Sequence, residues 1–315
     1  MKQFSRRDLL ARAGTTAGAL AATASLPIAT AADSHSDGMP FRIGLNTSTL
    51  RGQKLPLTEL VETAAKAGYQ SLEPWISELQ DHVQRGGSLK DLGKRAQDLG
   101  LTVASSIGFA EWIVDDDARR AKGLEQAKRD MDLVHQFGGL RMAAPPAGAT
   151  NVANLDLAKA AERYRALLEA GDRIGVVPEV EVWGFSKTLT RLSHAAAVAI
   201  DSRHPSACVL PDIFHLYKGG SDFGGLKLLS GQAIHVIHVN DYPDLPRDKI
   251  KDADRVFPGD GVAPLAAVFR DLRDAGFRGT LSIELFNPNY WRQDPKQVAR
   301  TALEKTRALV ADALR

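Results

Sequence analysis

The sequence predicts an α/β fold made of one (β/α)8 barrel. Eight short apolar runs alternate along the chain with longer segments whose apolar residues recur at helical spacing. No second apolar centre or linker interrupts residues 41–315, and this length suits a single barrel of eight strands and eight helices. A dinucleotide-binding sheet agrees less well with the chain, because no G-x-G-x-x-G motif follows the first apolar run.

The expected strands are the eight apolar runs, at residues 41–49, 70–75, 101–110, 140–146, 175–184, 207–215, 233–241 and 280–288. The segments with helical spacing include residues 57–68, 89–100, 155–175 and 263–276. Each of these four segments ends at a glycine, which is a typical helix C-cap. The pattern predicts one barrel domain over residues 41–315, with a flexible leader at residues 32–40 before it.

Residues 1–31 have the composition of an export signal. The segment begins with a basic stretch, continues with an apolar stretch rich in Ala and Gly, and ends near an A-x-A cleavage site in ATAAD. Arg6 and Arg7 in SRRDLL form the pair that is typical of twin-arginine signals. The sequence therefore predicts passage through the twin-arginine export machinery and a periplasmic location.

The charge and the cysteine content limit the possible partners. The formal net charge of the whole chain is +2. Residues 1–31 hold four basic side chains and one acidic one, so the mature chain carries a charge of about −1. This balance argues against a nucleic-acid partner, which needs a basic face. The single Cys208 excludes an intramolecular disulfide and is expected to pack in its strand as a small apolar residue.

Polar side chains occupy the ends of the last four expected strands. These residues are Glu181, Asp212, His238 and Glu284. In a (β/α)8 barrel the carboxyl ends of all strands meet at one face, where active sites lie. Three buried carboxylates at this face would repel one another unless a cation lay between them. We therefore expect these four residues to bind one divalent metal, Mn²⁺ first, with Mg²⁺, Co²⁺ or Zn²⁺ as the other ions that suit these ligands.

Three further residues lie near these strand ends and are candidates for substrate binding. His215 follows Asp212 by three residues and could hydrogen-bond a substrate oxygen; the alternative is a surface histidine. Arg255 follows the seventh strand and could hold a substrate oxygen, with Asp254 holding it or another group in place. The alternative for this pair is two solvated loop charges.

Two residues of the same strands have less obvious roles. Glu179 points to the same side of its strand as Glu181, one layer deeper in the barrel, and could pair with a buried base such as Arg141. His235 points to the opposite side from His238 and is expected to face the helices rather than the metal.

Several aromatic residues fall near strand ends or in the loops that follow, namely Phe109, Trp112, Trp183 and Trp291. They could form apolar walls that stack on a sugar ring and exclude water. For any one of them, a place in the core or in a lid is the simpler interpretation.

Four motifs carry a resemblance to a known family: EVWGF, LPDIFH, HVNDYPDLPRDKIKDADRVFPGDG and SIELFNPNYW. Through their order and spacing the chain resembles the sugar isomerases and epimerases with a xylose isomerase-like TIM barrel, and among them the inosose isomerases most closely. The resemblance extends over essentially the whole mature chain and departs from the family pattern at Pro178, Glu179 and Asn240.

The resemblance implies roles for the residues at the matching positions. Glu181, Asp212, His238 and Glu284 would bind one divalent metal, and the residues at positions 215 and 255 would contact the substrate. Barrels of this family often pair, so a homodimer is also consistent with it.

These observations lead to the hypothesis of an exported metal-dependent isomerase or epimerase. A keto-sugar or an inosose-like keto-cyclitol would react through an enediolate, with Glu181 and Glu284 moving the proton. One alternative is a lyase or dehydratase acting on a 3-keto-glycoside or a dehydroshikimate-like acid. A second is a metal-dependent sugar-binding protein without catalytic activity.

Overall fold

The computed structural model describes residues 39–315, so the predicted signal peptide and most of the predicted leader lie outside the described residues. All strand pairs in the two sheets of this part are parallel, and the predicted eightfold barrel is confirmed. Its strands are β1 (Arg42–Asn46), β2 (Ser71–Glu73), β3 (Thr102–Val103), β4 (Arg141–Ala144), β5 (Val177–Glu181), β6 (Val209–Leu210), β7 (Val236–Val239) and β8 (Thr280–Ile283).

The barrel wall consists of two arcs of hydrogen-bonded strands. The five-stranded arc has the order β3-β2-β1-β8-β7, and the three-stranded arc has the order β4-β5-β6. Single parallel bridges join the two arcs, one between Ile107 and Ala143 and the other between Asp212 and His238. Strand β6 is shorter than the predicted run because Pro211, which lacks an N–H group, follows it directly.

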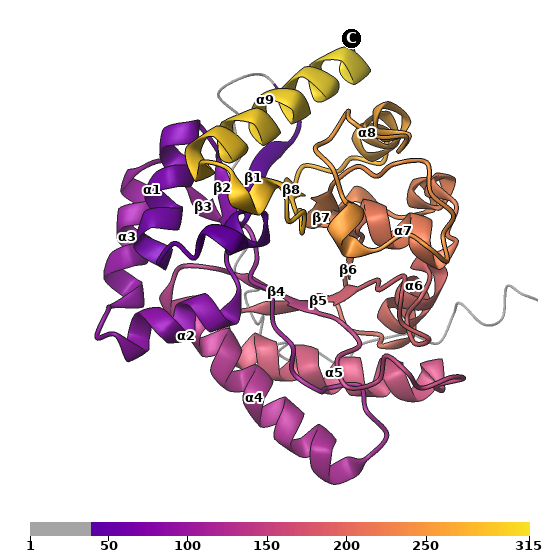
Figure 1. The fold of residues 1–315 in the computed structure, drawn as a ribbon. Coiled ribbons are helices and arrows are strands. Elements are labelled where there is room, and N and C mark those ends of the chain that lie inside the picture. The colour runs from indigo at the N-terminus through magenta and orange to yellow at the C-terminus, as the bar shows by residue number, and fades with distance from the viewer. Residues whose placement is uncertain (1–38) are drawn as a thin grey trace, which may run out of the picture. The chain divides into compact units, whose positions relative to one another are not determined.

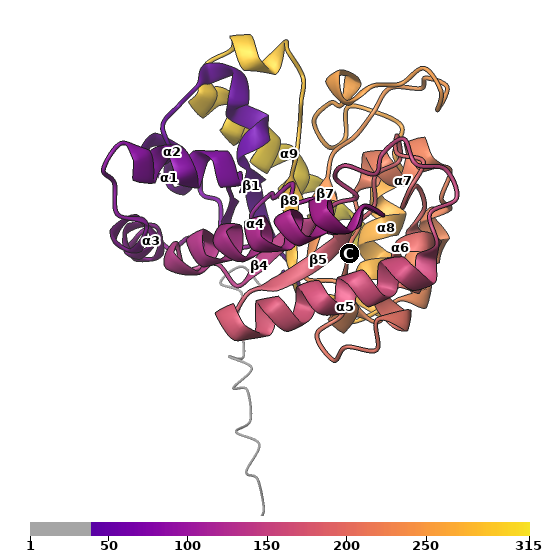
Figure 2. The ribbon, with the colours of Figure 1, turned by 90° about the horizontal axis from the view of Figure 1, so that it is seen from below.

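The α-helices surround the strands (Figure 1). They are α1 (Leu57–Ala67), α2 (Ile76–Gln84), α3 (Leu89–Asp98), α4 (Asp117–Gln136), α5 (Leu157–Ile174), α6 (Leu192–Asp201), α7 (Ile213–Gly219), α8 (Leu265–Asp274) and α9 (Pro295–Leu314). Helices α4 and α5 lie side by side, which is clearest in Figure 2, and α9 packs against α1 and α8. Two helices, α2 and α3, connect β2 to β3.

Short 3-10 helices shape several of the loops. They are η1 (Thr47–Gln53), η2 (Phe223–Leu228), η3 (Gly231–Ala233), η4 (Asp252–Asp254) and η5 (Tyr290–Arg292). Within residues 39–315, the helices are all too short or too polar to cross a membrane.

Two of the four predicted glycine C-caps are confirmed, and in α3 and α8 the glycine lies one residue after the C-caps Leu99 and Ala275. Gly68 and Gly175 are the C-caps of α1 and α5, with φ angles of 95° and 86°. A residue with a Cβ is strained in this left-handed region, which explains glycine at both positions. Cys208 is buried just before β6, as its apolar surroundings in the sequence predict.

A small apolar cluster within the barrel lies on the strand faces that also carry the polar residues of the site. It consists of Ala104, Ile107, Ala143, Leu210 and Val236. Leu210 and Val236 precede Asp212 and His238 by two residues, so alternation along a strand directs each pair to the same side. The interior is therefore apolar below and polar at the carboxyl ends of the strands.

Candidate metal centre

Four strand ends bring the expected metal ligands together. Glu181 is the last residue of β5, Asp212 follows β6, His238 lies in β7 and Glu284 follows β8. All four are at most 4% exposed. They converge because the barrel places the carboxyl ends of parallel strands around one opening.

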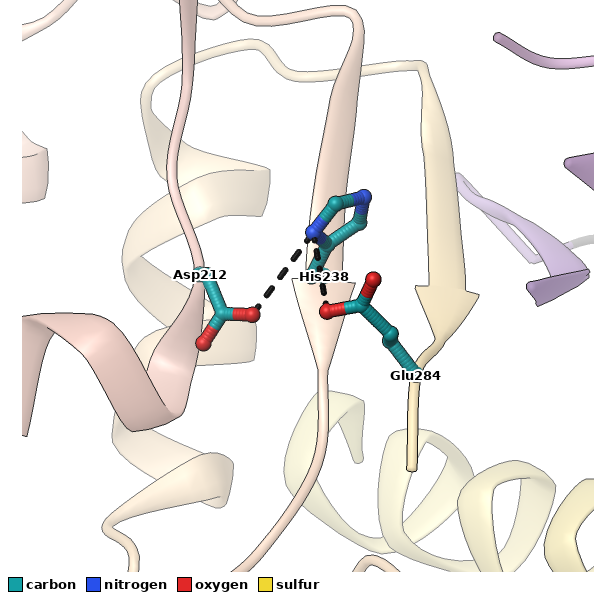
Figure 3. Close-up of side chains that lie close together, drawn as sticks. All are labelled: Asp212, His238 and Glu284. Carbon is teal, nitrogen blue, oxygen red and sulfur yellow. Dashed lines mark ion pairs between the residues drawn. The ribbon is translucent and has the colours of Figure 1, made fainter. Parts of the chain in front are cut away.

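One nitrogen of His238 is the common point of the cluster. Its Nδ1 lies 3.3 Å from Oε2 of Glu284, 3.5 Å from Oε1 of Glu181 and 3.6 Å from Oδ2 of Asp212. Figure 3 shows Asp212 and Glu284 directed toward this nitrogen from the two neighbouring strands. One ligand atom from each of Asp212, His238 and Glu284 lies within 4.8 Å of the other two, and Glu181 faces the same nitrogen from β5.

Glu73, at the end of β2, holds the other nitrogen of His238. Its Oε2 lies 3.1 Å from Nε2 of His238 and also accepts hydrogen bonds from Ser282 (2.6 Å) and Asn46 (2.9 Å). Burial by itself would raise the pKa of Glu73, but His238 and these donors keep it below its usual value. A carboxylate that fixes the Nε2 proton leaves the Nδ1 lone pair free for a metal.

The donor atoms suit a divalent cation. Oε2 of Glu181 and Nδ1 of His238 are buried and have no hydrogen-bond partner among residues 39–315. Burial raises the pKa of Glu181 to about 8 and that of Glu284 to about 7, although His238 opposes both shifts. Three carboxylates and one imidazole fit Mn²⁺, Mg²⁺, Co²⁺ or Zn²⁺, and such an ion would keep the carboxylates ionised.

Arg255 lies beside this cluster and is fully buried, so it is not a solvated loop charge. Its Nη1 donates to Oδ2 of Asp212 (2.8 Å) and to Oε2 of Glu284 (2.9 Å), the same oxygens that face His238. Its Nη2 donates to Oδ1 of Asp252 at 2.6 Å. The guanidinium therefore fixes the side chains of two of the expected metal ligands.

The residue that holds Arg255 is Asp252 rather than Asp254. Both belong to η4, but the carboxylate of Asp254 turns back to accept a hydrogen bond from the backbone N–H of Lys251 at 2.8 Å. Asp254 does not contact the metal ligands, and we find no hydrogen bond from it to Arg255 in the described range.

His215 is buried in the first turn of α7, so the alternative of a surface histidine is wrong. Its backbone N–H donates to Oδ1 of Asp212 at 2.9 Å, and its Nε2 lies 3.2 Å from Nη2 of Arg255. Because a guanidinium only donates hydrogen bonds, Nε2 accepts and Nδ1 carries the proton. Burial lowers the pKa of His215 to about 4, so the ring is neutral at neutral pH. Its Nδ1–H has no partner among the described residues and is available to a ligand.

A second buried acid, Glu179, lies one layer below the metal centre. It pairs in register with Ala143 of β4, and its Oε1 is 3.9 Å from Nε of Arg141, the partner that the sequence suggested. Neither oxygen of Glu179 has a hydrogen-bond partner within the part that the structure describes. Burial raises the pKa of Glu179 to about 8, although Arg141 opposes the shift. His235 precedes β7, is partly exposed and stays outside the cluster.

The four aromatic residues that the sequence singled out have different roles. Trp112 is a core residue, buried against Tyr164, with its Nε1 donating to the carbonyl of Pro145. Trp291 fastens η5 to η1 through a hydrogen bond from Nε1 to the carbonyl of Ser48. Only Phe109 and Trp183 pack against each other, at 6.0 Å between ring centroids, in the loops at the carboxyl ends of the strands.

Sequence reasoning missed two polar residues that support the site. Glu73 and Asn46 end β2 and β1, and they stand at strand ends just as the four ligands do. Asn46 donates to Glu73 and also to Oε1 of Glu284 at 3.2 Å. Applying the strand-end rule to the first strands would have found both. Asn240, noted as a departure from the family pattern, directs its side-chain amide toward both oxygens of Asp212, at 3.4 Å.

Comparisons with known proteins agree with this architecture. A family model described as Xylose isomerase-like TIM barrel matches residues 61–309. An inosose isomerase of Bacillus licheniformis is 32% identical over 155 residues, which are 49% of this chain and 56% of that protein. A 3-dehydroshikimate dehydratase of Pseudomonas aeruginosa is 28% identical over 244 residues, 74% of this chain and 37% of that one. The matches thus span about half or less of these curated relatives.

Among solved structures, the IOLI protein with a binding zinc atom superposes with a TM-score of 0.78. The superposition covers 87% of this chain and 99% of that protein at 22% sequence identity. At this identity the likeness establishes the fold alone.

Proposed function

We propose that this protein, which belongs to the xylose isomerase-like TIM barrel family, is a divalent-metal-dependent isomerase or epimerase that acts on a keto-sugar or keto-cyclitol. The observation that carries the proposal is the convergence of Glu181, Asp212 and Glu284 on Nδ1 of His238. The inosose isomerase relative supports an isomerase, and the dehydratase relative supports a lyase as the second candidate.

The four ligands would hold one cation, for which Mn²⁺ is our first choice because three of the four donors are carboxylates. When bound, a divalent cation polarises a carbonyl group and makes the neighbouring C–H group more acidic. Metal analysis of the purified protein by mass spectrometry tests this choice, since Zn²⁺ and Co²⁺ also fit the donor set.

Two carboxylates would move the proton. Glu181 comes from β5 and Glu284 from β8, so they reach the centre from different arcs of the barrel. One removes the proton next to the substrate carbonyl, and the same or the other returns it to give the isomer or the epimer. Arg255 holds Glu284 by a 2.9 Å hydrogen bond, which limits the motion of that carboxylate.

His215 and the buried surroundings stabilise the enediolate. The Nδ1–H of His215 would donate a hydrogen bond to a substrate oxygen on which negative charge develops. Because the pKa of His215 is lowered to about 4, the ring acts as a hydrogen-bond donor and not as an acid at neutral pH. A donor that is fixed in advance needs no reorganisation when the charge forms.

Solvent exchange tests this function without knowledge of the natural product. The Mn²⁺-loaded protein is incubated in D₂O with inososes, ketohexoses and 3-keto-glycosides, and the acid-quenched compounds are analysed by mass spectrometry. We expect deuterium next to the carbonyl with the wild type and with Glu304→Gln, a matched change on the exposed side of α9. Glu284→Gln should abolish the uptake.

The products separate the candidates. An isomer or epimer supports the first proposal, and an unsaturated product with loss of water or of a glycosyl group supports the lyase. Binding of a keto compound with no deuterium uptake by the wild type would leave a sugar-binding protein as the better description.

We also propose that residues 1–31 direct export to the periplasm, where the substrate would be an extracytoplasmic keto compound. Fractionation of cells that express the wild type or the double variant Arg6→Lys, Arg7→Lys tests this. Equal amounts of both proteins in the periplasm would contradict it.

A further inference from the structure

A strip of aromatic rings borders the metal centre. Trp75 packs on Phe109 at 5.0 Å between ring centroids, Phe109 on Trp183 at 6.0 Å, and Trp183 on Phe185 at 5.0 Å. Phe185 in turn lies 5.4 Å from the ring of His215. Phe109 and Phe185 are 36% and 46% exposed, so part of the strip faces solvent. These side chains belong to the loops after β2, β3 and β5, and they form one continuous apolar wall.

Arg51 stands at the end of this strip. It belongs to η1, which follows β1, and its guanidinium carbon lies 3.4 Å from the centroid of the Trp75 ring. The same carbon lies 5.7 Å from the centroid of Phe286, which follows Glu284 by two residues. The guanidinium carbon of Arg255 lies 5.0 Å from this Phe286 centroid. The two guanidinium groups therefore border one ring beside the metal centre.

The two arginines differ in their partners. Arg255 donates hydrogen bonds to Asp212, Glu284 and Asp252. Arg51 is only partly buried, and its guanidinium makes no hydrogen bond or close ion pair with any residue between 39 and 315; Glu78 and Glu284 act on it electrostatically without accepting a hydrogen bond. Stacking on Trp75 holds the guanidinium by its face and leaves its N–H edges free for a ligand.

A partly desolvated cation without an acceptor favours an anionic ligand over a neutral one. The planar fork of a guanidinium matches the two oxygens of a carboxylate.

We propose that Arg51 binds a carboxylate on the substrate and that the aromatic strip holds the substrate ring. Within the keto-cyclitols of the proposed function, the substrate class is then a cyclic hydroxyketone that also carries a carboxylate group. This inference rests on the proposed function, because it describes the same site, but its binding test does not depend on turnover.

The first experiment measures binding of two unreactive cyclic probes to the Mn²⁺-loaded protein by calorimetry. Quinate carries a carboxylate and myo-inositol does not. We expect the wild type to bind quinate about tenfold or more tightly than inositol, as for a charge-assisted contact. Arg51→Gln should remove this preference and leave the inositol affinity unchanged, and Arg51→Lys should keep part of it. Arg300→Gln, an exposed change on α9, is the matched control.

Equal affinities of the wild type for the two probes, or no measurable quinate binding, would overturn the role of Arg51. An equal loss of affinity for quinate and for inositol in Arg51→Gln would also overturn it. The exchange assay is then repeated with an inosose and with 3-dehydroshikimate. If neither compound exchanges but the preference for quinate depends on Arg51, the isomerase proposal is refuted and the carboxylate site is supported. If the inosose exchanges equally in the wild type and in Arg51→Gln, and neither protein prefers quinate, the isomerase proposal is supported and the carboxylate site is refuted.

Discussion

Glu181 and Glu179 are two buried glutamates on one strand, two residues apart, in contrasting surroundings. Glu181 meets a histidine and two further carboxylates at the carboxyl ends of the strands. Glu179 lies one layer deeper, with Nε of Arg141 at 3.9 Å and Ala143 of β4 opposite it in register. Burial raises the pKa of each to about 8. A bound cation would offset the cost of burying the charge of Glu181, whereas Arg141, Ser105 and His238 oppose the raised pKa of Glu179 without overcoming the effect of burial. Equal burial therefore does not imply equal function.

The largest expected effect is on catalysis. Glu181→Gln removes one of the two carboxylates proposed to move the proton, so we expect the deuterium exchange rate to fall by about 10³-fold. Glu179→Gln keeps the size of the side chain and lies below the centre, so we expect a change of less than about tenfold. Exchange rates at saturating Mn²⁺ measure both. A comparable fall in the exchange rate of the two variants would mean that Glu179 and Glu181 act together in the reaction.

A smaller effect is expected when His238 loses the carboxylate behind it. Glu73→Gln replaces the acceptor that fixes Nε2 of His238 with an amide, and we expect Mn²⁺ affinity to fall by roughly 10–100-fold. Competition with a chelating dye measures the affinity, and Glu304→Gln on α9 serves as the control. Unchanged affinity would show that strand packing alone orients the imidazole.

The last prediction concerns stability and its dependence on pH. Because the folded-state pKa of Glu179 is raised to about 8 from 4.5, the wild type loses stability as pH rises between these values. Glu179→Gln removes this loss, so we expect the variant to match the wild type near pH 4 and to be more stable by roughly 5 kcal/mol above pH 8. Urea unfolding across this range measures the difference.

The sign of the effect makes the test decisive. A variant that is less stable than the wild type at pH 8.5 would mean that Glu179 is ionised and paired in the folded protein. A constant difference at all pH values would show that Glu179 does not titrate between the two values.

Much of this architecture follows from the sequence because the barrel imposes it. Once eight strands alternate with helices, the carboxyl ends must meet, and Glu181, Asp212, His238 and Glu284 follow from position alone. The choice of Asp252 over Asp254 does not follow, because the turn of η4 decides which carboxylate faces Arg255.

The contacts of Arg51 are equally hidden from the sequence. Its stacking joins loops that follow β1, β2 and β8, and no spacing within one segment predicts that meeting. Glu73, by contrast, ends a strand as the expected ligands do, so its place beside His238 is predictable from its position in the sequence.

The seam between β6 and β7 has a mechanical consequence. A single bridge, from Asp212 to His238, joins the two arcs there. Glu181 and Asp212 belong to the three-stranded arc, and His238 and Glu284 belong to the five-stranded arc. An ion bound by all four residues would link the two arcs across one of the two seams that a single bridge closes, so the same ion would also stabilise the closed barrel.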